Sequence, residues 1–511
     1  MKDTVNVLYP NVFREVWFNV VLRAYERHNW NPIYMIADNK YENVIRDKIP
    51  KAIFHDRDKA IVGMPSDECI NEIEIPVIDK DIINRFKEDE SLVLHMLDRY
   101  DSGNSFTYRE RVYYYYKMLR YWMGVLNHYK PDMVVYPHVP HMGYDYVIYM
   151  LCKEKNIATS MFLELPFGKI TFTGDYKNHF PIWHEYEKLK NNEVEVNLPG
   201  YLEKHLSDIN DSYDKAIPFF MKRNKNKYLN NMLVQTAKMI KGKINNTIKN
   251  TAHLLTNLPR RWDVKEKGKK WNYIITKKMH RKYRKYDQIN RLNYTQYYKK
   301  HTTDFDIKRK YVYVPMHYQP EESSCPRGEI YAHQNLLIHI VSCCIPDDWK
   351  VYVREHPLQF YGSITGSRSR SIQDYEQILE IPNVELIDTS VSSFELIDNA
   401  KAVATITGTA GWEAVIRGIP VLLFGHPWYK GCEGVFYTPT VECCRDAINI
   451  IEKGYKPDID KVRLFAYVAD THSIRGVTNP KSEQGFGIER NNNVKNVTDY
   501  LLSIQPDIYK I

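Results

Sequence analysis

Short apolar runs alternate with helix-like stretches along residues 310–424, and this alternation constrains the fold more than any other feature. We expect strands at 311–315, 349–354, 384–387, 402–406 and 420–424, with helices at 333–344, 372–379, 393–399 and 411–417. A repeated strand, helix, strand order favours a parallel sheet with helices on both faces. The sequence therefore predicts a doubly wound α/β unit in this half of the chain.

A similar layout recurs in the first half, with expected strands at 5–9, 32–37, 132–136 and 157–163. At 511 residues the chain is longer than one hydrophobic core usually organises. We predict two Rossmann-like domains. Their expected bounds are 1–200 and 306–470, joined by a basic, mainly helical connector at 201–305. A tail at 471–511 is expected to end in a helix that packs back toward the first domain.

The net charge of +8 is distributed unevenly along the chain. Residues 222–300 hold 23 Lys and Arg against 3 acids, a local charge of +20, which leaves −12 for the rest. No apolar run approaches the length of a membrane span, and the first residues lack the pattern of a signal peptide. The eight cysteines include two adjacent pairs, which suits neither ordinary disulfides nor a zinc knuckle. These features predict a cytoplasmic protein that does not span a membrane.

Ligands of open parallel sheets bind outside the carboxyl ends of the strands, so the loops there are the first place to seek a site. One such turn joins strand 402–406 to the following helix, where Thr407, Gly408, Thr409 and Ala410 offer backbone N–H groups and hydroxyls to an anion. Glu413, one turn into that helix, could accept hydrogen bonds from ribose hydroxyls. A threonine cap with a glycine chosen for close packing is the structural alternative.

Two further strand ends carry polar residues. Arg354 and His356 follow strand 349–354, where a cation and an imidazole could stabilise negative charge on a departing phosphate. The loop after strand 311–315 contains Gln319, Glu321 and Ser323. We expect these residues to form one nucleotide-binding site with the 407–410 turn.

Several strings in this region resemble bacterial capsule polysaccharide biosynthesis proteins, a group that includes Kdo transferases. They are Gln319-Pro320-Glu321, Arg354-Glu355-His356-Pro357, Thr405-Ile406-Thr407-Gly408-Thr409-Ala410-Gly411-Trp412-Glu413-Ala414, Gly418-Ile419-Pro420-Val421 and Phe424-Gly425. The resemblance covers residues 310–450 well and the first domain only in layout. It implies the glycosyltransferase-B fold, in which a nucleotide-sugar-binding second domain and an acceptor-side first domain face each other across a cleft.

The resemblance also implies roles for individual residues. His356 and residues 407–409 would contact the nucleotide and its phosphate. The catalytic carboxylate would come from the first domain, where the string Leu163-Glu164-Leu165-Pro166-Phe167-Gly168 is the nearest equivalent of the family motif. It has one carboxylate and a displaced glycine, which leaves retaining and inverting chemistry both open. Glu164 is the expected base or nucleophile, and a structural polar residue at a strand end is the alternative.

His138 and His141 follow strand 132–136, and we expect them to hydrogen-bond the acceptor or donor, with His141 a further catalytic candidate. A structural role for the two histidines is the alternative. No third metal ligand stands near them in the sequence, so no metal or other cofactor is predicted. The expected activity is transfer of a sugar from a nucleotide donor, CMP-Kdo or a related CMP-ulosonic acid first and a UDP-sugar second, to a capsule or other surface polysaccharide. The alternatives are a CDP-alditol phosphotransferase of teichoic-acid type and a non-catalytic scaffold that binds glycan or nucleic acid.

The basic segment 222–300 mixes its charges with Trp262, Trp271 and several tyrosines. Such a stretch can lie on an anionic membrane surface, which would suit a lipid-linked acceptor and a peripheral position on the cytoplasmic face of the inner membrane. Nucleic acid is a less favoured partner, because nothing here matches a nucleic-acid-binding module. A solvated insertion remains the third interpretation. The sequence leaves the oligomeric state open.

Overall fold

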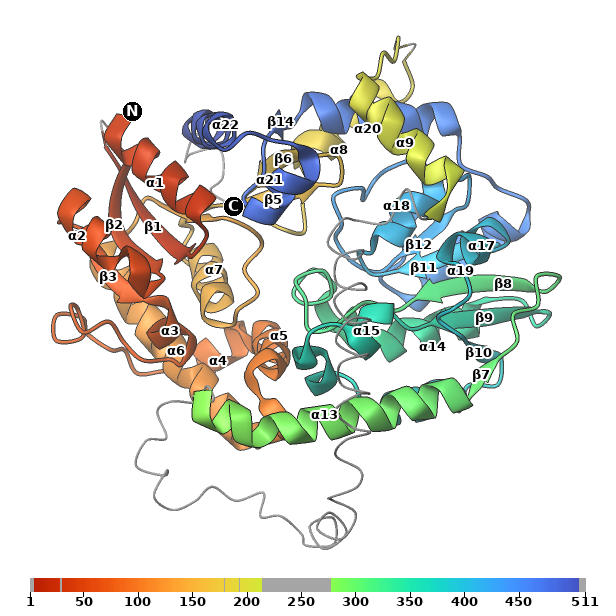
Figure 1. Ribbon diagram of the computed structural model, residues 1–511, viewed down its shortest axis with the longest axis horizontal. Coiled ribbons are helices and arrows are strands. Elements are labelled where there is room, and N and C mark those ends of the chain that lie inside the picture. The colour runs from red at the N-terminus through yellow and green to blue at the C-terminus, as the bar shows by residue number, and fades with distance from the viewer. Residues whose placement is uncertain (1–3, 28–29, 179, 193, 214–276, 505–511) are drawn as a thin grey trace, which may run out of the picture.

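A computed structural model of the 511-residue chain describes residues 4–27, 30–178, 180–192, 194–213 and 277–504. The described residues form two α/β domains, each built on one seven-stranded sheet (Figure 1). The fold confirms the predicted pair of Rossmann-like domains. All eight cysteines are free, in agreement with the spacing argument.

The first sheet has the strand order β14-β6-β5-β4-β1-β2-β3. Strands β5, β4, β1, β2 and β3 are parallel, whereas β6 and β14 are antiparallel to their neighbours. The bounds are β1 Val5–Val12, β2 Trp30–Ala37, β3 Ile53–Asp56, β4 Met133–Tyr136, β5 Ala158–Leu165, β6 Lys169–Thr173 and β14 Ile474–Arg475. The order reverses between β1 and β4, which places a switch point at the centre of the sheet.

The second sheet is parallel throughout, in the order β13-β12-β11-β8-β9-β10-β7. Its strands are nearly continuous buried apolar runs, as expected when helices cover both faces. The bounds are β7 Thr302–Thr303, β8 Lys310–Pro315, β9 Trp349–Arg354, β10 Val384–Ile387, β11 Ala402–Thr405, β12 Val421–Leu423 and β13 Val435–Tyr437. Its switch point lies between β8 and β11.

Helices cover both sheets. Those of the first domain are α1 Glu15–Arg27, η1 Asn39–Tyr41, α2 Glu42–Lys48, α3 Arg57–Ile61, α4 Lys80–Arg85, α5 Lys87–Met96, η2 Leu97–Tyr100, η3 Ser102–Asn104, α6 Tyr108–Tyr129 and α7 Tyr144–Glu154. Those of the second are η5 Glu329–Ala332, α14 Gln334–Cys344, α15 Pro357–Tyr361, η6 Ile364–Arg368, α16 Ile372–Leu379, α17 Ser393–Asp398, α18 Thr409–Ile416, α19 Val441–Glu452 and α20 Ile459–Thr471. Local signals set some of these bounds: a capping box of Thr107 and Glu110 starts α6, and Lys130 in the left-handed region ends it.

The segment between the domains differs from the expected boundary at residue 200. Helices α8 (Phe180–Leu189) and α9 (Gly200–Asp211) pack on the second domain, where Tyr186 meets Phe465 and Leu202 joins the cluster around Trp412. The packing unit of the second domain therefore begins near residue 180. The sequence of α8 predicts an apolar face but does not indicate which of the two sheets this face covers.

Helix α13 (Lys277–Lys300) runs along one side of both domains as a strap (Figure 1). At its centre the buried carboxylate of Asp287 accepts a 2.7 Å hydrogen bond from the backbone N–H of Gly103 in the first domain. The other oxygen lies 3.1 Å from Arg368 Nε in the second domain. Near its end, Tyr294 and Tyr298 are fully buried in the second core.

The chain then returns to the first domain. Strand β14 pairs with β6, and helix α22 (Arg490–Leu502) packs against α1, next to which it lies in Figure 1. Val497 and Leu501 are buried in the same cluster as Val20 of α1. Helix α21 (Pro480–Phe486) lies between these two elements in the chain.

Candidate active site

A cavity of about 390 Å³, the cleft pocket, opens between the two domains. It lies at the carboxyl ends of the central strands, where both switch points place their loops. The first domain contributes Arg14, Arg99, Pro137, His138, His141, Phe162, Leu163 and Glu164. The second contributes Glu321, Glu322, Ser323, Arg327 and Trp428, and the returning chain adds Thr478 and Asn479. Five of the residues singled out in the sequence thus meet here: His138, His141, Glu164, Glu321 and Ser323.

The two histidines lie on the loop after β4, with ring centroids 4.7 Å apart. His138 Nδ1 donates to the Val139 carbonyl at 3.0 Å, and its Nε2 accepts from Asn11 Nδ2 at 3.3 Å. His141 Nδ1 donates to the same carbonyl at 2.8 Å, which puts the lone pair on Nε2. Burial lowers the pKa of His138 to about 3 and that of His141 well below its usual value. Both rings are therefore neutral near pH 7.

A carboxylate from the second domain approaches this loop, since Glu322 Oε2 lies 3.8 Å from His141 Nδ1. His138, His141 and Glu322 have potential ligand atoms within 4.8 Å of one another, the spacing of a possible cation site. The premise that no third ligand lies near the histidines was therefore wrong, because domain docking supplies one. Both ring nitrogens of His138 are already hydrogen-bonded. This leaves His141 Nε2 and a carboxylate oxygen of Glu322 as the two atoms that an ion could bind.

Glu321 and Glu322 line the cavity from the loop after β8. Burial within the surrounding protein raises the pKa of Glu322 to about 7, partly opposed by Arg327, whereas Glu321 is exposed. Glu322 can therefore gain or lose a proton near neutral pH, as general acid and base groups must.

Glu164, at the end of β5, faces the cleft pocket and is also the anchor of the returning chain. Its Oε1 accepts from the backbone N–H groups of Thr478 and Asn479 at 2.9 Å each and from the Thr478 hydroxyl at 3.0 Å. Its Oε2 accepts from the Ser482 hydroxyl at 2.9 Å. Four donors occupy most of the lone pairs of this carboxylate, which disfavours a role as base.

A smaller cavity of about 80 Å³, the second-domain pocket, lies within the second domain. It is lined by Tyr213, Tyr313, Pro315, Met316, Arg354, Glu355, His356, Pro357, Ser393, Thr409, Ala410 and Glu413. Five of these residues were singled out in the sequence: Arg354, His356, Thr409, Ala410 and Glu413. The expected single site is thus divided into two pockets.

His356 caps helix α15, where its Nδ1 accepts from the backbone N–H of Leu358 at 3.2 Å. Nε2 therefore carries the proton of the neutral ring, because burial lowers the pKa of His356 to about 3. The ring can donate a hydrogen bond to an anion but carries no positive charge. Arg354 supplies that charge: one terminal nitrogen donates to the Thr389 carbonyl at 2.8 Å, and Nε is buried with no acceptor among the described residues.

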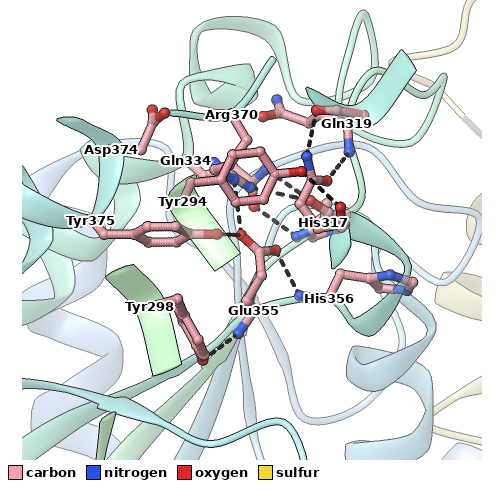
Figure 2. Close-up of polar contacts among 12 residues, drawn as sticks. Tyr294, Tyr298, His317, Gln319, Gln334, Glu355, His356, Arg370, Asp374 and Tyr375 are labelled. Carbon is pink, nitrogen blue, oxygen red and sulfur yellow. Dashed lines mark hydrogen bonds and ion pairs between the residues drawn. The ribbon is translucent and has the colours of Figure 1, made fainter. Parts of the chain in front are cut away.

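A buried network behind His356 fixes its backbone, and Figure 2 shows Glu355 at the centre of it. Glu355 Oε1 accepts from the backbone N–H of His356 at 2.6 Å, while Oε2 accepts from Tyr375 at 2.7 Å and lies 2.8 Å from Arg370 Nε. The backbone N–H of Glu355 donates to Tyr298 of the strap at 2.9 Å. All four residues of the Arg-Glu-His-Pro string thus line the pocket, and Glu355 also positions His356.

At the other side of the second-domain pocket lie Thr409 and Glu413, one turn apart on α18. Burial raises the pKa of Glu413 to about 7, partly opposed by a hydrogen bond to Thr409. Thr409 is the first residue of the helix, and Gly408 precedes it as the N-cap.

Three predicted contact residues line neither pocket. The Thr407 hydroxyl donates to the Ser323 carbonyl, and its backbone N–H donates to His317 Nε2 at 3.1 Å. The backbone N–H of Gly408 donates to Thr405 Oγ1 at 3.3 Å. Gln319 is buried and donates to the Ala332 carbonyl at 2.6 Å. The Thr407 hydroxyl is therefore bonded to Ser323, a residue of the cleft pocket, and is not offered to a phosphate.

Arg14, Arg99, Arg327 and Glu322 belong to the cleft pocket and escaped the sequence analysis. Arg14 follows β1 at the carboxyl edge of the sheet, a position that the strand-end rule could have flagged. Arg99 lies in the short helix η2, where no pattern distinguishes it from a surface arginine.

The basic segment 222–300 lies mostly outside the described residues. Its described part is the strap α13, which contacts both domains. Within the described residues, none of the helices combines the length and the apolarity that a bilayer crossing requires.

Residues 263–447 match the family described as capsule polysaccharide biosynthesis protein. This confirms the resemblance over that range, which contains the strap, the loop after β8 and all of the second-domain pocket except Tyr213. No curated protein matches the chain.

Solved structures resemble the chain only distantly. UDP-GlcNAc 2-epimerase from Methanocaldococcus jannaschii is 12% identical with a TM-score of 0.23, over 91% of this chain and 99% of that one. The beta Kdo 2,4 transferase of Thermosulfurimonas dismutans KpsC is 13% identical with a TM-score of 0.22, over 36% and 54% of the two chains. The beta Kdo 2,7 transferase of the same protein is 11% identical with a TM-score of 0.25, over 68% and 89%. The fold assignment above rests on the strand orders of the two sheets.

Proposed function

We propose that this chain, whose residues 263–447 match the capsule polysaccharide biosynthesis proteins, is a glycosyltransferase that moves a sugar from a nucleotide donor to a surface polysaccharide. The observation that carries the proposal is the cleft pocket between two Rossmann-like domains, lined from both sides by groups able to transfer protons. A transferase of this kind needs donor and acceptor to meet in a place shielded from bulk water.

The second-domain pocket is the proposed site for the donor phosphate. His356 Nε2–H and the Thr409 hydroxyl would donate to its oxygens, and Arg354 would balance its charge. Glu413 would accept from a ribose hydroxyl. Negative charge grows on this phosphate as the sugar leaves, so donors fixed by the surrounding network lower the barrier without having to reorient.

In the cleft pocket, His141 is the proposed general base. Its neutral Nε2 would take the proton of the acceptor hydroxyl while that oxygen bonds to the anomeric carbon and the bond from this carbon to the phosphate oxygen breaks. His138 and Glu321 would hydrogen-bond the sugars. Glu164 remains the alternative as nucleophile, which would give a covalent intermediate and a retained anomeric configuration.

The identity of the nucleotide in the donor is the first property to determine, from the shift in melting temperature that each nucleotide causes. We expect CMP to raise the melting temperature more than CDP, UDP or GDP, which corresponds to a CMP-ulosonic acid such as CMP-Kdo as donor, and a larger effect of UDP would indicate a UDP-sugar. Product mass then separates sugar transfer from the CDP-alditol phosphate transfer of teichoic-acid polymerases. If no nucleotide stabilises the protein, the non-catalytic scaffold is the better interpretation.

Membrane association is a separate proposal that depends on the charge of residues 222–300. A charge of +20 over this stretch would attract an anionic inner leaflet at about 1 kcal/mol per basic residue near the surface. Sedimentation with vesicles that contain or lack anionic lipid tests it. Equal recovery in both supernatants would remove this role and leave the transferase proposal intact.

A further inference from the structure

Asn11 is a buried polar residue beside the two histidines of the cleft pocket, and it has no part in the chemistry proposed so far. It lies near the carboxyl end of β1 and is only 1% exposed. Its Oδ1 accepts a 2.9 Å hydrogen bond from Arg57 Nε, and its Nδ2 donates to His138 Nε2 at 3.3 Å. Because Arg57 follows β3 and His138 follows β4, this one amide joins three strand ends of the first sheet.

The partners of Asn11 and His138 fix which atom donates in each hydrogen bond. An arginine N–H can only donate, so Asn11 presents its carbonyl oxygen to Arg57 and its NH₂ group to His138. The carbonyl of Val139 can only accept, so the proton of His138 is on Nδ1, which lies 3.0 Å from it. Burial and nearby arginines keep this ring neutral. Its lone pair is therefore on Nε2, where Asn11 already occupies it.

His141 has the same tautomer but lacks such a partner. Its Nδ1 donates to the same Val139 carbonyl at 2.8 Å, which leaves the lone pair on Nε2. None of the described residues donates a hydrogen bond to this nitrogen, and His141 lines the cleft pocket. The two rings, whose centroids are 4.7 Å apart, thus differ in whether the Nε2 lone pair is free.

Phe13 supports this arrangement from the loop after β1. Its ring lies 6.1 Å from that of His138 in an edge contact, and the Arg57 guanidinium lies 4.5 Å from its centroid. Asp38 is 3.7 Å from the same guanidinium. Arg57 is therefore held by an aromatic ring, a carboxylate and the Asn11 amide, which gives the amide one favoured orientation.

We propose that Asn11, held by Arg57, is a positioning residue that withholds His138 Nε2 and leaves His141 Nε2 as the basic nitrogen of this histidine pair. The inference rests on the proposed function, in which His141 takes the proton of the acceptor hydroxyl. Two free basic nitrogens side by side would let that hydroxyl bind at either ring, although only one position aligns it with the anomeric carbon. The amide removes the second position without adding charge to the pocket.

Diethyl pyrocarbonate tests the inference on the full-length protein, because it acylates an imidazole nitrogen whose lone pair is free. Peptide mass spectrometry gives the rates at His138 and His141 separately. In the wild-type protein we expect His141 to react at least about tenfold faster than His138, the equivalent of one hydrogen bond. Asn11→Leu keeps the branched shape and removes the donor, so it should raise the rate at His138 about tenfold and leave that at His141 unchanged. Arg57→Met should act in the same direction.

Asn31→Leu is the matched control, because Asn31 Nδ2 donates to Asn6 Oδ1 at 2.9 Å near the amino ends of β1 and β2. This variant should react as the wild-type protein does. Asn11→Asp keeps the shape and the bond to Arg57, which guards against a leucine variant that fails to fold. It replaces the donor by an acceptor, so the ¹⁵N NMR signal of His138 Nε2 should show a proton on that nitrogen.

Equal rates at the two histidines of the wild-type protein, or an unchanged rate at His138 in Asn11→Leu, would overturn the inference. A rise at both histidines together would also overturn it, because it would mean that Asn11 only holds the loop in place. Asn11→Leu should in addition lower kcat about tenfold without weakening nucleotide binding. If the rates of acylation change as expected and kcat does not, the positioning role is supported and His141 is not the base, so a failure of the proposed function is recognised separately.

Discussion

Glu164 and Thr478 lie 314 residues apart in the chain, and two hydrogen bonds of 2.9 and 3.0 Å join them at the wall of the cleft pocket. Replacement Glu164→Ala removes these bonds and those to Asn479 and Ser482, and we expect about 1–3 kcal/mol of destabilisation from the loss of a charged acceptor. Glu164→Gln keeps a carbonyl acceptor and should melt closer to the wild-type temperature. If Glu164→Gln instead abolishes transfer at an unchanged melting temperature, Glu164 reacts with the sugar itself.

The proposed general base, His141, can be tested by substitution. His141→Gln should lower kcat by about 10²- to 10⁴-fold, the usual contribution of general base catalysis, while nucleotide binding stays the same. Because burial holds the pKa of His141 well below its ordinary value, acidification from pH 8 to pH 6 should not inactivate the enzyme through this ring. A kcat that falls along a titration near pH 6.5 would show that the ring is charged in solution and would contradict the assignment.

Glu322 gives a prediction about stability and pH. Its pKa is about 7 in the fold and lies near its ordinary value of 4.5 in the unfolded chain, so the folded state holds more protons between these pH values. The penalty for burying the charge is absent below pH 4.5, grows as the pH rises from 4.5 to 7 and is complete above pH 7. Glu322→Gln should therefore raise the melting temperature by a few degrees at pH 8 and have little effect at pH 5. An equal shift at both pH values would mean that the carboxyl group is not desolvated.

Thr409 and Thr407 stand two residues apart and should behave differently. Thr409→Val removes a hydroxyl from the second-domain pocket, and we expect nucleotide binding to weaken by about tenfold with little change in melting temperature. Thr407→Val removes the bond to Ser323 and should act mainly on stability. Calorimetry with the stabilising nucleotide and a thermal melt separate the two effects. The reverse pattern would restore the original prediction that Thr407 holds the phosphate.

Asp287 joins the strap to both domains through Gly103 and Arg368. Asp287→Asn leaves the Arg368 charge buried without its partner, and we expect a loss of about 3–5 kcal/mol in stability. Asp446→Asn on α19, an exposed acid, is the control. A wild-type melting temperature for Asp287→Asn would show that the strap contributes little to the docking of the domains.

Much of the second domain could be predicted because its parallel strands are buried on both faces and therefore read as continuous apolar runs. The expected strands at 349–354 and 384–387 coincide with β9 and β10. Strands of two or three residues such as β7, β13 and β14 are too short to show a hydrophobic pattern in the sequence. Their pairing depends on the neighbouring strands in the folded sheet.

The candidate site could be predicted only where one loop held the signal. The Arg-Glu-His-Pro string and the 407–410 turn each lie on one strand end, and most of their residues do line a pocket. The approach of Glu322 to His141, by contrast, depends on how two separately folded sheets dock. Arg99 reaches the cleft pocket from the short helix η2, where no local pattern distinguishes it.

The return of β14 and α22 to the first domain bears on how this protein is made. During translation, residues 474–502 leave the ribosome only after the whole second domain has been synthesised. Until then, the side of β6 that pairs with β14 is exposed, and α1 lacks its contact with α22. An exposed edge strand is a template for wrong pairing between nascent chains. Chaperone demand during synthesis should therefore fall if residues 474–502 are supplied in trans as a peptide.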